Sequence, residues 1–233
     1  MIPISDTPGR RYRFPFVMLA ILVLNVLVFL YELMLPPDAL QGFFQSAGVI
    51  PVEYTAGQDV PPPPPGSIVW LTLFTSMFMH GGFLHIASNM LYLFIFGDNV
   101  EDRLGHIGFL LFYLLCGLAA GLTHIFFNAT SSIPSIGASG AIAGVLAGYL
   151  LLFPQAQVRT LLFLGPFITI TRISALLLIG FWFLTQLLAG VASLGATTEQ
   201  TAGIAFWAHI GGFIVGLILV NLFRLHRPAY YRG

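Results

Sequence analysis

Polar side chains capable of proton transfer or nucleophilic attack occur at three places in an otherwise apolar chain. His85 and Asn89 are four residues apart, so on a helix they lie one turn apart and share a face. Ser139 stands in a Gly-Ala-Ser-Gly run, and His209 lies in a later apolar stretch. A histidine within about 3 Å of a serine oxygen can remove its proton. Ser139 and His209 are therefore a candidate nucleophile and general base.

The histidines admit two kinds of chemistry. Two hydrogen-bond donors on one helix face, His85 and Asn89, predict an oxyanion hole for an intermediate formed at Ser139. Zinc binding is the rival, but His80 and His85 are one residue further apart than a helical His-Glu-x-x-His pair, and no glutamate lies between them. No carboxylate ligand is evident either. We therefore favour the oxyanion hole and expect neither a metal nor another cofactor.

Each residue of the Ser139–His209 pair is ambiguous alone, because serine and histidine also occur as packing or hydrogen-bonding residues between membrane helices. No Asp or Glu lies near His209 in its apolar stretch. The acids expected on the same side of the membrane fall in loops: Asp38, Glu53, Asp59 and Glu199. The sequence therefore predicts a dyad rather than a triad.

The composition places these residues in a membrane. The chain is 57% hydrophobic and 8% charged, with a mean hydropathy of +0.89, which is too little polar surface for a soluble globule. A spanning helix needs about 20 apolar residues. Six stretches qualify, the fourth being short: Phe14–Leu35, Phe83–Phe96 with the apolar residues before it, Ile107–Phe127, Ser139–Phe153, Ile173–Leu188 and Ile204–Phe223. We expect an all-α protein with a six-helix membrane domain over 14–223, between segments 1–13 and 224–233.

The charges predict how the chain is oriented. All nine basic residues are arginines, and a cytoplasmic N-terminus puts each of them on the cytoplasmic side of six spans, as the positive-inside rule requires. Loops 36–68, 128–136 and 190–202 contain none and are expected to face outward. We expect a multi-pass protein of the inner (cytoplasmic) cell membrane with both termini in the cytoplasm. Zero net charge and no basic patch argue against a nucleic-acid partner.

Glycine spacing predicts which helices touch. Small residues at every fourth position allow helix backbones to approach closely in lipid. Two stretches carry them: Gly140, Gly144 and Gly148 in one, Gly212 and Gly216 in the other. Ser139 adjoins the first set and His209 precedes the second by three residues, so this contact would bring the pair together.

These residues, in this order, resemble the rhomboid family of intramembrane serine proteases over about 71–221. The motifs are His80-x4-His85-x3-Asn89, Gly137-x-Ser139-Gly140 and Ala208-His209-x2-Gly212-x3-Gly216. The resemblance implies a six-helix rhomboid fold and cleavage of other membrane proteins, in or near their transmembrane segments, close to the outer leaflet. Ser139 would be the nucleophile and His209 the base and then the acid.

The resemblance also assigns supporting roles. His85, Asn89 and the backbone near Gly140 would form the oxyanion hole. His80 would be a structural hydrogen-bonding residue at the edge of the site, and the three remaining motif glycines would support it: Gly137, Gly212 and Gly216. The polar turn around Glu101 and Arg103 would be structural.

Two departures from the family pattern stand out. Many rhomboids have a Trp-Arg pair before the second helix, whereas here Trp70 is followed by Leu71 and Thr72. Many also place a tyrosine one turn after the serine, stacked on the catalytic histidine, whereas this chain has Ala143. The histidine must then be positioned by another group. The fifth helix, bulky around Trp182, is a candidate lateral gate.

Two other functions remain open. An inactive rhomboid-like protein would bind client helices without cutting them, and it would lack the serine or the histidine. A transporter or channel would need polar groups that continue to the cytoplasmic leaflet, whereas the residues after Ser139 and His209 are apolar. The sequence predicts neither the oligomeric state nor the natural substrate.

Overall fold

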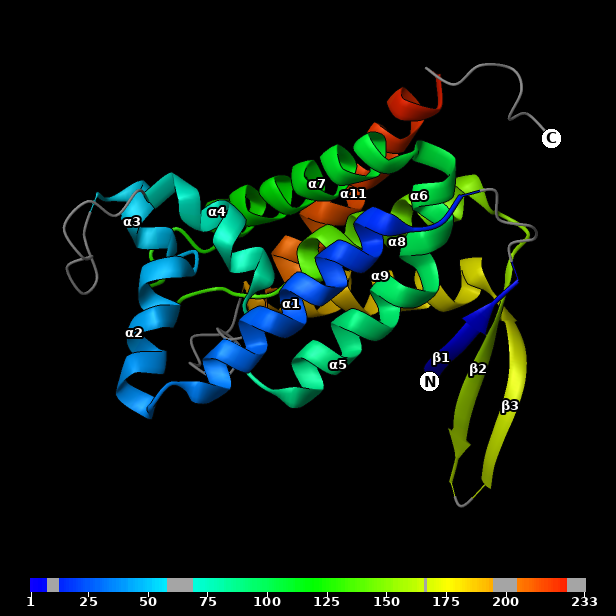
Figure 1. The fold of residues 1–233 in the computed structure, drawn as a ribbon, viewed down its shortest axis with the longest axis horizontal. Helices are drawn as coiled ribbons and strands as arrows, with labels where there is room; N and C mark the ends of the chain where they lie inside the picture. Colours follow the sequence, from blue (N-terminus) through cyan, green and yellow to red (C-terminus); the bar gives the residue numbers. More distant parts are fainter. Residues whose placement is uncertain (8–12, 58–68, 166, 195–204, 226–233) are drawn as a thin grey trace.

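The computed structural model describes residues 1–7, 13–57, 69–165, 167–194 and 205–225 (Figure 1). The prediction of a mostly helical protein is confirmed. Expectations that concern residues 58–68 of loop 36–68, most of loop 190–202 and the tail from residue 226 lie outside this part. The helices are α1 (Phe16–Met34), α2 (Pro37–Ala47), α3 (Pro51–Thr55), η1 (Val69–Leu71), α4 (Thr72–Thr75), η2 (Ser76–Phe78), α5 (Phe83–Tyr92), η3 (Leu93–Gly97), α6 (Asp98–Leu104), α7 (His106–Phe127), α8 (Ser139–Leu152), α9 (Ala175–Ser193) and α11 (Phe206–Leu225).

Each of the six predicted stretches contains a helix, but six full spans are not established. By length and apolar composition, α1, α7, α9 and α11 can each cross a membrane. A fifth span results if the helical segments Val69–Phe78 and Phe83–Leu104, bent by 81° against each other, count as one. With 14 residues, α8 is about 21 Å long, less than the roughly 30 Å hydrocarbon core. The chain is a multi-pass membrane protein.

Helix α8 lies at the centre of the bundle, where every residue from Gly140 to Tyr149 is buried. It packs against α7 and α11. A Cβ added to Gly212 would overlap the carbonyl oxygen of Gly140, and one added to Gly216 would lie 2.6 Å from that of Gly144. The two glycine faces therefore meet backbone to backbone, and α8 begins directly beside α11.

The N-terminus of α1 is tied to α6 by a buried carboxylate. Glu101 accepts backbone hydrogen bonds from Val17 (3.0 Å) and Met18 (2.7 Å), and its other contact is His106 at 2.5 Å. The first amides of a helix have no intrahelical acceptor and favour negative charge. Arg103 lies over the ring of Phe153 at 5.1 Å. These contacts fix the ends of helices, away from Ser139.

The all-α prediction is wrong at one end of the bundle, where a three-stranded antiparallel sheet projects (Figure 1). Its order is β1 (Ile2–Asp6), β2 (Gln157–Leu164) and β3 (Phe167–Ser174). The segment between the fourth and fifth predicted stretches is rich in β-branched and aromatic residues, which favour strands. Gly165, with φ 61°, stands at the turn between β2 and β3. Similarly, the predicted outward loop 36–68 contains the helices α2 and α3.

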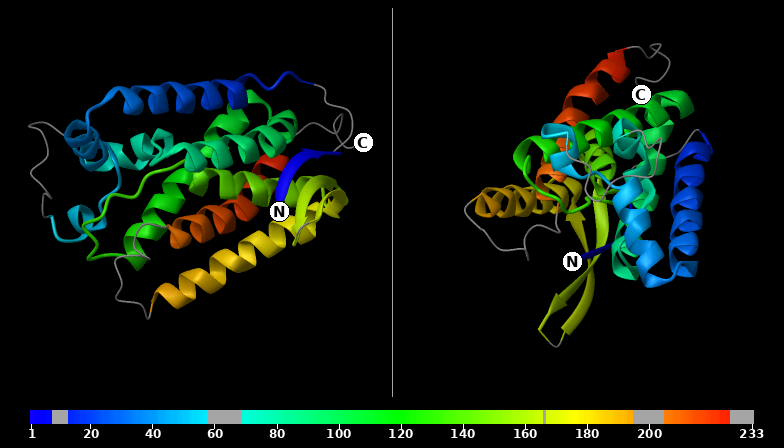
Figure 2. Two further views of the ribbon diagram at one scale, coloured as in Figure 1. Left: turned by 90° about the horizontal axis from the view of Figure 1, so that it is seen from below. Right: turned by 90° about the vertical axis from the view of Figure 1, so that its left-hand side faces the viewer.

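Strand β1 is anchored to the helices by Asp6. Its carboxylate accepts hydrogen bonds from the Tyr149 hydroxyl on α8 (2.7 Å) and the Asn99 amide on α6 (2.9 Å). The predicted segment 1–13 is therefore partly a structured edge strand. Figure 2 shows the sheet leaving the bundle between α5 and α9.

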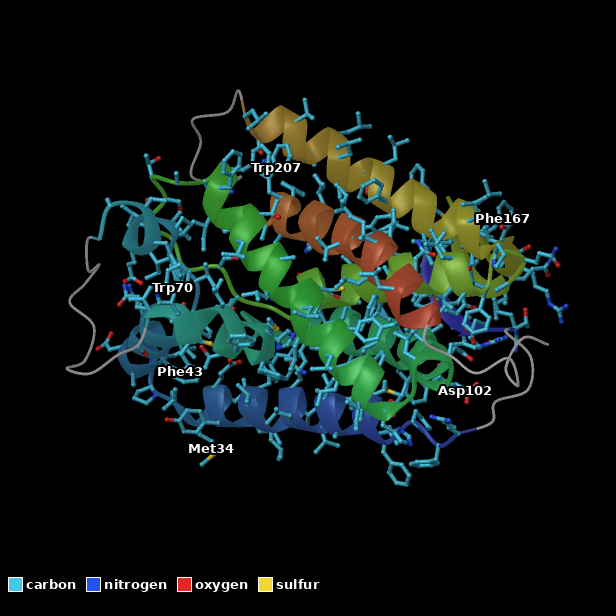
Figure 3. The ribbon with its side chains drawn as sticks, turned by 90° about the horizontal axis from the view of Figure 1, so that it is seen from above. Met34, Phe43, Trp70, Asp102, Phe167 and Trp207 are labelled. Carbon is cyan, nitrogen blue, oxygen red and sulfur yellow. The ribbon has the colours of Figure 1, made fainter. Side chains whose placement is uncertain are left out.

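The bundle has two chemically distinct ends. Met34, Phe43, Trp70 and Trp207 lie toward one end and Asp102 and Phe167 toward the other (Figure 3). We call these the α2–α3 end and the sheet end. Every arginine whose side chain the structure describes lies in or just before an element at the sheet end: Arg13, Arg103, Arg159 and Arg172. The described part of the α2–α3 end carries the acids Asp38 and Glu53 instead.

Candidate active site

Ser139 and His209 meet where α8 and α11 begin. The Ser139 Oγ lies 2.7 Å from the His209 Nε2, within hydrogen-bond distance. Ser139 is the first residue of α8, and His209 lies in the first turn of α11, three residues before Gly212. Because Gly212 packs on the Gly140 carbonyl, the helix contact itself sets the spacing between the two side chains. A serine and an imidazole at this distance can exchange a proton.

The second ring nitrogen of His209 contacts helix α9. The Gln186 Oε1 lies 2.7 Å from the His209 Nδ1. One turn earlier on α9, the Trp182 ring lies 5.7 Å from the imidazole, centroid to centroid. Gln186 was assigned no role from the sequence, although a polar amide in an apolar helix, one turn after Trp182, marks a candidate functional residue. Where the family pattern has a tyrosine in place of Ala143, the aromatic neighbour here comes from α9.

His85 approaches Ser139 from α5. Its Nδ1 accepts a hydrogen bond from the Gly81 amide at 3.4 Å, so in the neutral ring the proton is on Nε2. That Nε2 faces Gly137, where an added Cβ would lie 2.7 Å from it and 3.7 Å from the Ser139 Oγ. Gly137 has φ 128° and donates its amide to the Ser76 carbonyl at 2.8 Å. A side chain at Gly137 would thus be strained and would displace the imidazole.

Asn89 adds a second donor beside His85. Its side-chain nitrogen is buried and has no hydrogen-bond partner among the residues the structure describes. Such donors are rare in proteins, because each costs about 1–3 kcal/mol. Asn89 lines a cavity of about 640 Å³, which reaches from the dyad to β1. Its lining includes Leu84, His85, Asn89, Ser139, Trp182, His209 and, at the sheet, Met1, Ile2 and Pro3.

The start of α8 completes the polar surroundings of Ser139. The first amides of a helix, here those from Ser139 and Gly140 onward, have no intrahelical acceptor. The helix dipole makes this end attractive to negative charge. Together with His85 and Asn89, these amides give the cavity several donors near a single hydroxyl.

His80 acts through its backbone rather than its ring. Its amide donates to both oxygens of the Glu32 carboxylate, at 3.1 and 3.3 Å. Its ring lies edge-on to His85 at 5.0 Å, and within the described ranges neither ring nitrogen has a hydrogen-bond partner. The hydrogen bonds that link His80 to Glu32 therefore come from its backbone amide. Glu32 was not singled out from the sequence. An acid in the last turn of an apolar helix is costly to bury in a membrane, so its position could have marked it as a candidate functional residue.

The residues after Trp70 anchor the first loop without an arginine. The Tyr54 hydroxyl contacts the Thr72 hydroxyl at 2.5 Å and donates to the Val69 carbonyl at 2.6 Å. Tyr54 also packs edge-on against Trp70 at 5.2 Å. Burial raises the pKa of this phenol, which keeps it a neutral donor. Where the family pattern has an arginine after the tryptophan, this chain has Leu71 and Thr72, and its α3 is anchored by the contacts of Tyr54 with Trp70, Thr72 and the Val69 carbonyl.

Comparison with known proteins places the chain in a family. Residues 68–226, more than half of the chain, match the Rhomboid domain. Rhomboid-like protein 11, chloroplastic, from Arabidopsis thaliana is 31% identical over 66% of this chain and 52% of its own length. Rhomboid protein 1, mitochondrial, from Saccharomyces cerevisiae is 30% identical over 64% of this chain and 40% of its own.

A bacterial relative is named as an enzyme. Rhomboid protease GluP from Bacillus subtilis is 41% identical over 35% of this chain and 15% of its own length. The chain thus spans about half, or less, of the length of these curated relatives. On the strength of the domain match, the chain belongs to the rhomboid family.

Proposed function

We propose that this chain is an intramembrane serine endopeptidase that hydrolyses peptide bonds in or near transmembrane segments of other membrane proteins. The observation that carries the proposal is the 2.7 Å hydrogen bond between the Ser139 Oγ and the His209 Nε2. The name of the Bacillus subtilis relative, a rhomboid protease, supports the same activity. The catalytic unit is a Ser–His dyad, and no cofactor takes part.

The first half of the reaction is acylation of Ser139. The Ser139 Oγ attacks the carbonyl carbon of the scissile bond while its proton passes to the His209 Nε2. Negative charge then develops on the carbonyl oxygen. His85 Nε2–H, the Asn89 amide and the first amides of α8 stabilise it, which is commonly worth about 2.7–4 kcal/mol for a single donor. The carbon–nitrogen bond breaks as His209 returns the proton to the leaving amine.

The second half is hydrolysis of the acyl-enzyme. A water molecule loses a proton to His209, attacks the ester carbon and releases the new carboxyl terminus, and His209 then reprotonates the Ser139 Oγ. The polar lining of the cavity around the dyad is suited to hold this water. The apolar remainder of the lining suits a substrate segment from the bilayer.

We place the α2–α3 end at the outer face of the cell membrane and the sheet end in the cytoplasm. Domain 14–223 is then the membrane-embedded body, with both terminal segments cytoplasmic. Arginines at the sheet end support this orientation, because basic residues concentrate on the cytoplasmic side. Substrate cleavage therefore takes place near the outer leaflet.

Labelling with a fluorophosphonate tests the activity directly. This probe phosphonylates a serine only where a base activates it, so the purified wild-type protein should be labelled. Ser139→Ala and His209→Ala should each lose the label. Ser88→Ala is the matched control, because Ser88 lines the same cavity but donates its hydroxyl to the His85 carbonyl at 2.9 Å. Undiminished labelling of both dyad variants would contradict the proposal.

Cysteine accessibility tests the orientation. The native Cys116 is buried, so single cysteines can be added without removing it. In intact cells a membrane-impermeant maleimide should react with Asp38→Cys on α2 and reach Thr169→Cys on β3 only after permeabilisation. Both positions are exposed. The reverse pattern would mean that the sheet end faces outward.

A further inference from the structure

Helix α9 supplies a hydrogen-bond partner for His209. The Gln186 Oε1 lies 2.7 Å from the His209 Nδ1, on the opposite side of the ring from Ser139. Trp182, one turn away, packs beside the imidazole. In serine hydrolases with a triad, a carboxylate occupies the position of this amide and fixes the histidine tautomer. No such acid contacts His209 among the residues that the structure describes.

The orientation of the Gln186 amide is itself fixed by its neighbours. The Gln186 Nε2 donates to the Thr185 Oγ1 at 3.3 Å, and that hydroxyl donates to the Trp182 carbonyl at 2.6 Å. With its nitrogen engaged in this way, the amide presents its oxygen to the ring. An amide oxygen only accepts hydrogen bonds, so the His209 Nδ1 must carry the proton. The Nε2 that faces Ser139 is then free to accept.

We propose that Gln186 is a positioning residue that sets the tautomer and the orientation of His209, so that the working unit is Ser139–His209–Gln186. This inference rests on the proposed peptidase function. The amide remains neutral and takes no proton during the reaction. Its contribution is to keep the basic nitrogen directed at the serine hydroxyl. In a dyad alone, no group would fix the tautomer or the orientation of the ring.

The location of Gln186 on α9 links catalysis to the docking of that helix. Among the four long apolar helices, α9 has the smallest buried share, 22% of an 18-residue window. It lies at the outside of the bundle (Figure 2). Besides the contacts of Gln186 and Trp182 with His209, Phe183 stacks on Phe213 of α11 at 4.1 Å, and Gly190 packs against Ile210. If α9 moves away from α11, the Gln186–His209 hydrogen bond breaks. The histidine is therefore held in its reactive tautomer only while α9 is docked.

The rate of fluorophosphonate labelling tests this role without any need for a substrate. Gln186→Met keeps the approximate shape of the side chain but removes the hydrogen-bond acceptor. Gln186→Glu, a separate variant, keeps an acceptor oxygen. We expect Gln186→Met to lower kinact about 10–100-fold, within the range for loss of an orienting or proton-transfer group. KI should change less than about threefold, because the cavity is intact. Gln186→Glu should label within about fivefold of the wild-type rate.

Asn221→Leu is the matched control. It also removes an amide from a membrane helix, but within the described residues the Asn221 amide donates to the Leu217 carbonyl of its own helix, at 2.9 Å. Its labelling should equal that of the wild type. A Gln186→Met protein that labels within about twofold of the wild type would overturn the positioning role while Ser139-dependent labelling still supports the peptidase. A wild-type protein that does not label at Ser139 would instead remove the proposed function.

Nitrogen-15 NMR of the wild-type protein provides a test that does not depend on how any Gln186 variant folds. With nitrogen-15 in its histidines, the His209 signals are those that vanish in His209→Ala. We expect the neutral ring to carry its proton on Nδ1, and we expect this preference to be lost in Gln186→Met. A wild-type His209 that is protonated on Nε2 alone would overturn the proposal.

Discussion

Ser139→Ala and His209→Ala should each lower peptide-bond hydrolysis about 10⁴-fold or more, and the double variant should be no slower than either single one. The reason is that the two side chains act as one unit, joined by the 2.7 Å hydrogen bond. Without its base the serine hydroxyl is a poor nucleophile, and without the serine the base has no proton to remove. Independent contributions would multiply instead.

The measurement uses purified protein in lipid vesicles together with a single-span substrate. Such a substrate is found by comparing membrane-protein fragments from cells that express the wild type with those from Ser139→Ala cells. Initial rates for wild type, both single variants and the double variant complete the cycle. Rate losses that multiply in the double variant would show that Ser139 and His209 act separately. The control Ser88→Ala should cleave at the wild-type rate.

The parts of the site that were predictable from sequence depend on two local signals: the free-energy cost of a polar side chain in the membrane, and the spacing of residues along a helix. A polar residue in an apolar stretch is expensive, which marks Ser139, His209 and Asn89. Glycines at every fourth residue predict close backbone contact, and the structure brings Gly212 against Gly140. Both signals are local to one helix, so a single sequence carries them.

The parts that were missed depend on how helices are rotated against each other. Nothing in the spacing of α9 says that Gln186 points at His209, because that depends on the rotation and depth of two separate helices. Glu32 was missed for the same reason, since its partner is a backbone amide 48 residues away. The sequence predicts a Ser–His dyad because no acid lies near His209, and the structure adds the Gln186 amide oxygen, which lies 2.7 Å from the His209 Nδ1.

The sheet was missed because its residues suit two environments. Segment 157–174 is apolar and rich in β-branched residues, and in a membrane protein such a stretch is easily taken as a loop next to a span. Its first partner, β1, lies about 150 residues earlier in the chain. Pairing over that separation leaves no local pattern, so only the tertiary structure reveals the anchor that Asp6 provides.

Gly137→Ala should lower hydrolysis about 10²–10³-fold, comparable to the loss of one oxyanion donor. At φ 128° an alanine is strained, and its Cβ would lie 2.7 Å from the His85 Nε2, so the imidazole must move away from the oxyanion position. The measurement is the initial rate on the same single-span substrate. Gly165→Ala is the control, because Gly165 also has a positive φ, yet an added Cβ there meets nothing within 4 Å. It should cleave at close to the wild-type rate.

A second variant separates the steric effect on His85 from general damage to the backbone. If Gly137→Ala acts by displacing the imidazole, then adding it to His85→Ala should cost little more, because the group it displaces is already gone. The strain at φ 128° would remain in both backgrounds and would lower thermal stability equally. Rate losses that multiply in the double variant would mean that Gly137 acts on Ser139 through the backbone.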